Sequence, residues 1–183
     1  LQEYANIRKT GIIAINLREN DEVFRVKLTN NENELMLTSK LGKAIRFLEK
    51  DVSDVGRNST GVRGIKLQEK DELIGLEIVA LGGTLLTVTE KGFGKRTKLE
   101  EYAVIRRGGK GVRNIKVSEK NGSVVSTSIV NDADEFIIVT KKGQVIRLEV
   151  NQINVIGRNT SGVRLIRVNE NDSVATVAKI NKE

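Results

Sequence analysis

The chain has 183 residues, with 31 Lys and Arg against 24 Asp and Glu, which gives a formal net charge of +7. It contains no histidine, cysteine or proline, so zinc sites, Cys or Ser–His nucleophiles and a disulfide scaffold are excluded. No apolar run approaches the roughly 20 residues that span a bilayer. We therefore expect a cytoplasmic protein, without metal or cofactor, whose excess of cations favours a polyanionic partner.

The chain opens inside a repeated unit. Leu-Gln-Glu-Tyr at 1–4 matches Leu-Glu-Glu-Tyr at 99–102, but nothing before residue 1 matches the stretch 85–98. We therefore expect the chain to be a piece of a longer protein. In this first unit, alternation of apolar and polar residues predicts short strands at 12–17 and 23–28.

Three later stretches share a β-hairpin pattern, in which two apolar-rich runs flank a polar turn with a glycine that can take a positive φ. These hairpins are expected at 35–47, 85–99 and 137–148. The connecting segments 49–55 and 150–156 have mixed polarity, which fits either an extended chain or a single helical turn. No long helix is expected.

Four glycine loops alternate with these hairpins. Gly-Arg-Asn-Ser-Thr-Gly-Val-Arg-Gly-Ile at 56–65 returns as Gly-Arg-Asn-Thr-Ser-Gly-Val-Arg-Leu-Ile at 157–166, with looser copies at 7–15 and 105–115. The anchoring glycines are separated by 50, 50 and 51 residues and are Gly11, Gly61, Gly111 and Gly162. Short strands with a fifty-residue period predict an all-β, bladed, propeller-like array over residues 1–183, with three and a half to four blades.

Candidate catalytic groups are few. The acidic pairs Asp71–Glu72 and Asp132–Asp134 lie in expected turns, where Asp is favoured for local hydrogen bonds. Tyr4 and Tyr102 occupy equivalent repeat positions, which indicates a packing role. The sequence therefore predicts a binding protein and not an enzyme, with no small-molecule substrate.

The glycine loops are not nucleotide-binding loops, since no Lys-Ser or Lys-Thr follows the second glycine. Their glycines are expected to serve backbone geometry first. The basic residues point to function, because a fold by itself needs no charge there, and equivalent loops of stacked units would form a stripe along one rim. The expected phosphate contacts are Arg8, Lys9, Arg57, Arg106, Arg107, Lys110 and Arg158, widened by the hairpin residues Lys95 and Arg96.

The partner expected from these loops is duplex DNA, bound through its phosphates. Aromatic residues make up only 3% of the chain, so stacking platforms for unpaired bases are few. No helix is offered to read base edges in a major groove. A propeller-like scaffold that binds an acidic protein remains the alternative from another class.

The segments 56–65, 92–97 (Gly-Phe-Gly-Lys-Arg-Thr) and 157–164 resemble the C-terminal domain family of DNA gyrase A. The resemblance covers essentially the whole chain and implies the later blades of a six-bladed β-pinwheel that wraps DNA for a supercoiling type IIA topoisomerase. Arg-Arg-Gly-Gly-Lys-Gly at 106–111 is similar to the family's wrapping signature, but Ile105 replaces its leading glutamine and the loop stands in a later blade.

The resemblance implies a non-catalytic module of an ATP-dependent bacterial topoisomerase, located in the cytoplasm with the nucleoid. The implied partners are duplex DNA, the rest of gyrase A and, through it, gyrase B, with no membrane. It also implies phosphate contacts at Arg106, Arg107 and Lys110. The related C-terminal domain of topoisomerase IV, carried by its A-type polypeptide, is the alternative within the same class.

Overall fold

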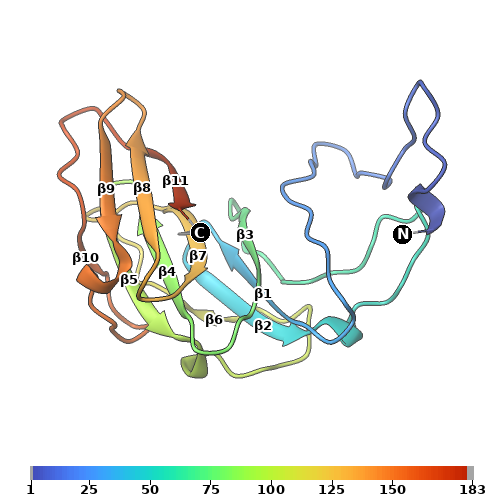
Figure 1. Ribbon diagram of the computed structural model, residues 1–183, viewed down its shortest axis with the longest axis horizontal. Helices are drawn as coiled ribbons and strands as arrows, with labels where there is room; N and C mark the ends of the chain where they lie inside the picture. The colour runs from blue at the N-terminus through green and yellow to red at the C-terminus, as the bar shows by residue number, and fades with distance from the viewer. Residues whose placement is uncertain (1, 181–183) are drawn as a thin grey trace.

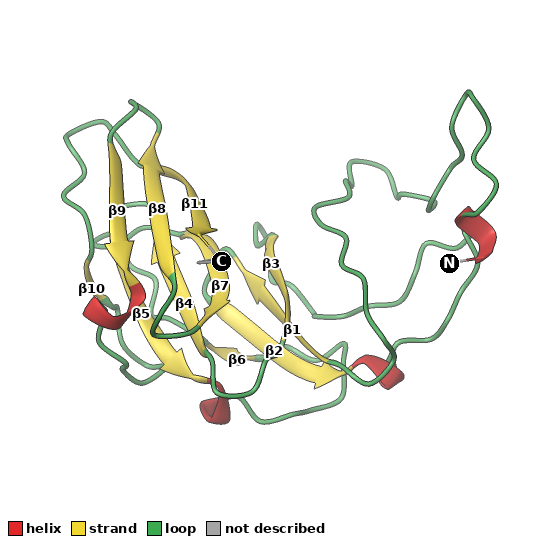
Figure 2. Cartoon of the chain, viewed as in Figure 1, coloured by secondary structure: helices red, strands yellow, loops and turns green. Residues whose placement is uncertain are grey.

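The computed structural model describes residues 2–180, which form three antiparallel sheets joined by loops (Figures 1 and 2). Sheet 1 has the order β3-β1-β2-β6, with β1 Glu34–Ser39, β2 Lys43–Leu48, β3 Leu73–Ile78 and β6 Val112–Arg113. Sheet 2 has the order β10-β5-β4-β7, with β4 Thr84–Thr89, β5 Phe93–Lys98, β7 Val124–Val130 and β10 Val163–Arg164. Sheet 3 has the order β11-β8-β9, with β8 Glu135–Thr140, β9 Val145–Glu149 and β11 Val174–Ile180.

The helical content of the described chain is limited to four short 3₁₀ turns, drawn red in Figure 2. They are η1 Gln2–Tyr4, η2 Glu49–Asp51, η3 Leu99–Glu101 and η4 Val150–Gln152. Two of them lie in the connecting segments, which therefore adopt the single helical turn. Over residues 2–180, no helix has the length and apolar character needed to cross a membrane.

The three predicted hairpins are confirmed as β1-β2, β4-β5 and β8-β9. The alternation of apolar and polar residues agrees with the strand register: Leu37 lies opposite Ile45, and both are buried. The turn glycine Gly42 has φ 79°, a conformation that glycine adopts without steric cost. The sequence therefore determines each hairpin locally.

The outermost strand of sheets 1 and 2 comes from far along the chain. β6 follows the second hairpin but pairs with β2 of the first, and β10 follows the third hairpin but pairs with β5 of the second. The anchor Gly111 has φ 63°, and a Cβ there would lie 2.4 Å from the Ala44 carbonyl oxygen. A Cβ on Gly162 would likewise lie 2.7 Å from the Gly94 carbonyl oxygen. These glycines thus let a glycine loop join the edge of an earlier sheet.

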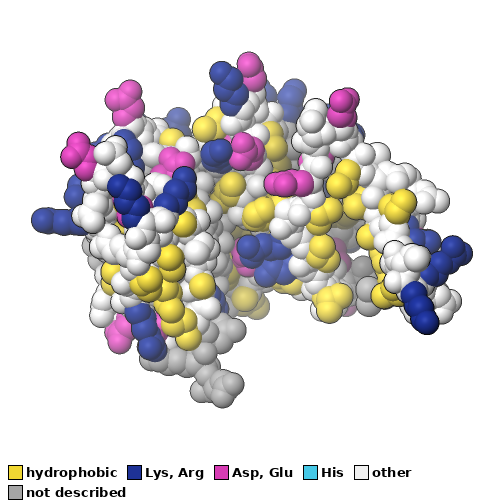
Figure 3. All heavy atoms as spheres, turned by 90° about the horizontal axis from the view of Figure 1, so that it is seen from above, with side chains coloured by type: hydrophobic (Ala, Val, Ile, Leu, Met, Phe, Trp, Pro, Cys, Tyr) yellow, Lys and Arg dark blue, Asp and Glu magenta, His cyan; other side chains and the backbone are white. Residues whose placement is uncertain are grey.

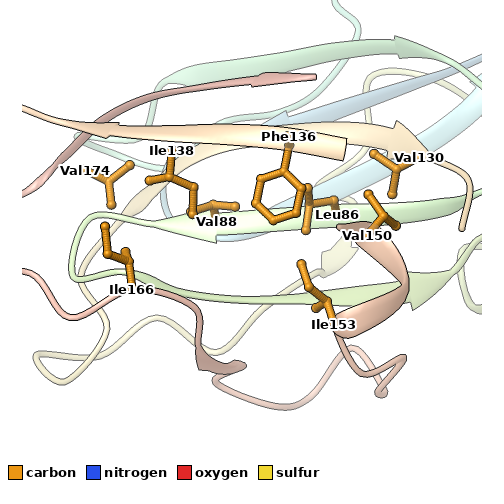
Figure 4. Close-up of a cluster of buried hydrophobic side chains, with 9 residues drawn as sticks. All are labelled: Leu86, Val88, Val130, Phe136, Ile138, Val150, Ile153, Ile166 and Val174. Carbon is orange, nitrogen blue, oxygen red and sulfur yellow. The ribbon is translucent and has the colours of Figure 1, made fainter. Parts of the chain in front are cut away.

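Adjacent sheets pack through their other edges and through apolar clusters. β3 contacts β7, and β7 contacts β11. Figure 4 shows the cluster between sheets 2 and 3, where Leu86 and Val88 of β4 face Phe136 and Ile138 of β8. Ile166, which follows β10, closes the same cluster. This packing fixes successive sheets side by side, so that β6 and β10 lie at their outer edges.

Tyr102 has the predicted packing role. It is 1% exposed, and its hydroxyl donates to Asn114 Oδ1 at 2.6 Å. The Asn114 amide donates in turn to Thr87 Oγ1 of β4 at 3.0 Å. Its counterpart Tyr4 is 41% exposed and donates to the Ala14 carbonyl at 3.0 Å, so the packing prediction is wrong for Tyr4.

The predicted strands at 12–17 and 23–28 are absent, because the described residues from the end of η1 to residue 33 form loops. In later units the stretch equivalent to 23–28 is β3, β7 or β11, and each pairs with the hairpin just before it. Among the described residues before 23, no such hairpin is present. Val26 and Leu28 are accordingly 78% and 76% exposed.

Candidate nucleic-acid interface

Four of the predicted phosphate contacts are exposed side chains on glycine loops. Arg8 and Lys9 lie on the N-terminal loop, and Arg106 and Lys110 lie on the loop that leads into β6. Within residues 2–180, none of these four side chains makes a hydrogen bond or ion pair. They are therefore available to a polyanion in solution.

The other three loop arginines are engaged by the protein itself. The Nη1 of Arg57 donates to the Ile13 carbonyl at 2.9 Å, that of Arg107 to the Arg63 carbonyl at 3.0 Å, and that of Arg158 to the Arg113 carbonyl at 3.1 Å. All three side chains are half-buried. The expectation that the fold needs no charge at these positions is therefore wrong, because each arginine links its loop to the preceding glycine loop.

Lys95 and Arg96 were expected to widen the phosphate-contact surface, but both are buried, at 0% and 5% exposure. Lys95 Nζ donates to the carbonyls of Gly157 and Arg158 at 2.7 and 3.0 Å. Arg96 Nε donates to the Ile153 carbonyl at 2.8 Å, and its Nη1 pairs with Asp132. Both side chains bind backbone that follows the next hairpin, so neither is offered to DNA in this structure.

Burial lowers the pKa of Lys95 to about 8, with Glu101 opposing the shift. In the unfolded chain the pKa is near 10.5, so between these values the unfolded state binds more protons than the folded state. Stability should therefore rise as pH increases from about 8 to about 10.5, by roughly 1–3 kcal/mol. Urea unfolding across this pH range measures the rise.

The matched variant for this test is Lys95→Ile, because isoleucine stands at the equivalent hairpin positions 45 and 146. The variant lacks the titrating group, so the difference between the two stability curves isolates Lys95 from the other groups that titrate at high pH. Parallel curves would show that Lys95 keeps an ordinary pKa in the folded protein.

The structure also reveals two series of basic residues that the sequence prediction missed. The first is the arginine of the Val-Arg pair in three of the four glycine loops, and the second lies three residues further on. All six are exposed, with the repeat spacing of 50 and 51 residues, and within the described chain none forms an ion pair. They are Arg63, Arg113 and Arg164 in the first series and Lys66, Lys116 and Arg167 in the second.

The positions of Arg113 and Arg164 in the first series explain their exposure. Arg113 ends β6 and Arg164 ends β10, the outermost strands of sheets 1 and 2. The Arg164 guanidinium lies 5.1 Å from the centroid of the Phe93 ring, a cation–π contact that leaves its charge at the surface. The periodicity of the Val-Arg pairs could have identified these residues, but only the sheet order shows that they lie at outer edges.

The face of the molecule drawn in Figure 3 carries Lys and Arg side chains in separate groups along its length, with acidic side chains among them. On this face, charge is therefore distributed along the array in separate groups. Such a surface can contact a long polyanion at intervals.

Comparison with known proteins gives a consistent family match. The model of the DNA gyrase C-terminal domain, a β-propeller, matches residues 1–30, 33–80, 83–131 and 134–181. The DNA gyrase A polypeptide of Halalkalibacterium halodurans is 58% identical over 183 residues, which are 100% of this chain and 22% of that protein. The DNA gyrase A polypeptide of Escherichia coli is 43% identical over 180 residues, or 98% of this chain and 21% of that protein. The chain thus spans about a fifth of the length of these relatives.

Two solved structures are also similar. The DNA gyrase A C-terminal domain superposes with a TM-score of 0.86 and 30% identity, covering 94% of this chain and 59% of that one. The C-terminal domain of DNA topoisomerase IV superposes with a TM-score of 0.92 and 28% identity, covering 98% of this chain and 56% of that one. The predicted bladed fold is therefore confirmed.

Proposed function

This chain belongs to the DNA gyrase C-terminal domain family of β-propellers, and on that premise we propose that it binds and wraps duplex DNA. The proposal is carried by two equivalent sets of exposed cations, Arg113 with Lys116 and Arg164 with Arg167. Within the described residues, none of the four forms an ion pair. Because β6 and β10 are outer strands of adjacent sheets, these cations meet a DNA molecule that runs along the outside of the array.

Binding of this kind is independent of sequence. The candidate contacts are side-chain cations on an outer edge, and the partner surface is phosphate, which positions a duplex without specifying its bases. A curved array of such edges bends the DNA and so supports negative supercoiling. The chain contributes binding and curvature, while DNA cleavage and ATP hydrolysis belong to other parts of the enzyme.

The proposed partners follow from the same premise. They are duplex DNA, the rest of gyrase A and, through it, gyrase B, in the cytoplasm of a bacterium at the nucleoid. The exposed residues Arg8, Lys9, Arg106 and Lys110 extend the proposed contact surface onto the glycine loops. Topoisomerase IV is the second candidate, favoured by its TM-score of 0.92, and it shares the proposed mode of DNA contact.

Salt dependence tests the proposal directly. If the six exposed cations of the two series each neutralise one phosphate, affinity for a duplex of any sequence should fall about a thousandfold between 50 and 200 mM salt. Fluorescence anisotropy with two unrelated duplexes of equal length measures this. A slope of only one or two released ions would contradict DNA binding along the array and support a scaffold for an acidic protein.

A further inference from the structure

Three of the loop arginines, Arg57, Arg107 and Arg158, are each attached to the preceding unit at two points. The backbone N–H of Arg57 donates to Glu3 Oε2 at 3.0 Å, and that of Arg158 donates to Glu101 Oε2 at 3.1 Å. Arg107 Nε donates instead to the Asp51 carbonyl. These acceptors all lie in the 3₁₀ turns η1, η2 and η3. The start of each of these three loops is therefore tied to the 3₁₀ turn that lies one unit earlier in the chain.

The second attachment is the guanidinium bond to the preceding glycine loop, and its acceptor has a particular position. Arg107 bonds the carbonyl of Arg63, and Arg158 bonds the carbonyl of Arg113. The side chains of Arg63 and Arg113 are the exposed cations of the first basic series. The residue that receives the bond is thus the residue that presents a charge to DNA.

The arrangement repeats with the period of the fold. The donors Arg57, Arg107 and Arg158 are 50 and 51 residues apart, and two of the acceptors, Arg63 and Arg113, are 50 apart. Arginine suits this contact, because its planar guanidinium offers several N–H donors in a fixed fork, whereas lysine offers one flexible ammonium. Arg158 also lies 5.9 Å from the Tyr102 ring centroid and within 3.8 Å of Glu101.

From this arrangement we infer that Arg57, Arg107 and Arg158 are positioning residues that hold successive DNA-contacting edges at a fixed spacing. They set the curvature imposed on the DNA, while the exposed cations supply the binding charge. The inference rests on the proposed function, but the bonds themselves are tested without DNA. We call the three residues the linking arginines.

The test replaces all three linking arginines with lysine, which keeps the net charge. In the free protein, amide hydrogen exchange in the loops 106–113 and 157–164 should quicken on the order of tenfold, because each loop loses a charged hydrogen bond. On a short duplex labelled at both ends, saturating variant should bring the ends together by roughly half as much as the parent. The salt slope should stay within about one ion of the parent value.

The matched control is Arg18→Lys, Arg25→Lys and Arg147→Lys, the same chemical change at exposed arginines outside the glycine loops and the two basic series. It should keep the parent's loop exchange, salt slope and end-to-end distance. If the linking variant bends DNA as far as the parent, the inference is wrong. A second variant, Arg57→Gln, Arg107→Gln and Arg158→Gln, removes the three charges. If its salt slope falls by about three ions, the linking arginines contact phosphate directly, which also overturns the inference.

If thermal melting shows that the triple variant is unfolded, the single variant Arg107→Lys replaces it, and the same exchange and bending criteria apply.

Two readouts, the salt slope of the parent and the loop exchange of the free variant, separate failure of the proposed function from failure of the linking role. A parent protein that binds DNA with a shallow salt slope contradicts the proposed function. Unchanged loop exchange in the free variant contradicts the linking role alone.

Discussion

Replacing Arg63, Arg113 and Arg164 together with glutamine should lower the affinity for duplex DNA on the order of a hundredfold at 100 mM salt. The three residues are exposed, and each is proposed to neutralise one phosphate. The salt slope should therefore fall by about three. The loss should be equal for duplexes of different sequence, because phosphate contacts carry no base information. Anisotropy titrations over a range of salt concentrations measure both quantities.

The control removes the same charge elsewhere. Lys50, Lys98 and Lys141 are exposed and lie outside the two basic series, so their replacement with glutamine lowers the net charge equally. We expect this control to weaken binding only several-fold, through the general field of the protein. Equal losses in the two variants would mean that net charge, and not the outer edges of the sheets, determines DNA binding. Melting curves of both variants should match the parent, since surface substitutions rarely change stability.

Replacing Gly75 with alanine should destabilise the fold by about 3 kcal/mol. Gly75 lies in β3, where a Cβ would come within 2.1 Å of Thr38 Oγ1 and 2.3 Å of Thr127 Oγ1. The two hydroxyls hydrogen-bond each other at 2.7 Å and are buried. Since Thr38 belongs to sheet 1 and Thr127 to β7 of sheet 2, the added methyl group would separate adjacent sheets. Thermal melting should show a midpoint lowered by roughly 6–12 °C.

Gly56→Ala is the matched control, because a Cβ at that position has its nearest neighbour, Glu3 Oε1, at 3.5 Å. This control should leave stability within about 1 kcal/mol of the parent. In a background of Thr38→Ala and Thr127→Ala, the space for the methyl group is restored, so Gly75→Ala should cost much less there. An equal cost in both backgrounds would show that the steric conflict lies elsewhere.

The sequence determined the parts of this protein that depend on neighbouring residues. The hairpins follow from alternation and from turn glycines such as Gly42, because both strands of a hairpin lie within about fifteen residues and pair locally. The fifty-residue repeat predicted the blades, and the two Gly-Arg-Asn segments together with Gly-Phe-Gly-Lys-Arg-Thr at 92–97 indicated the family. The expectation that the anchor glycines serve backbone geometry is also confirmed, with Gly111 and Gly162 at φ 63° and 79°.

Tertiary structure alone decided which segments complete each sheet and which cations face solvent. β6 and β10 each pair with the hairpin one unit before the hairpin that directly precedes them in the sequence. No local pattern encodes a partner at that distance. The same crossing brings backbone carbonyls to Lys95, Arg96 and Arg107, so residues that look like surface cations become internal donors. Residues 23–28 have the pattern of a strand, but no hairpin lies before them among the residues that the structure describes, and a strand forms only where another chain segment satisfies its hydrogen bonds.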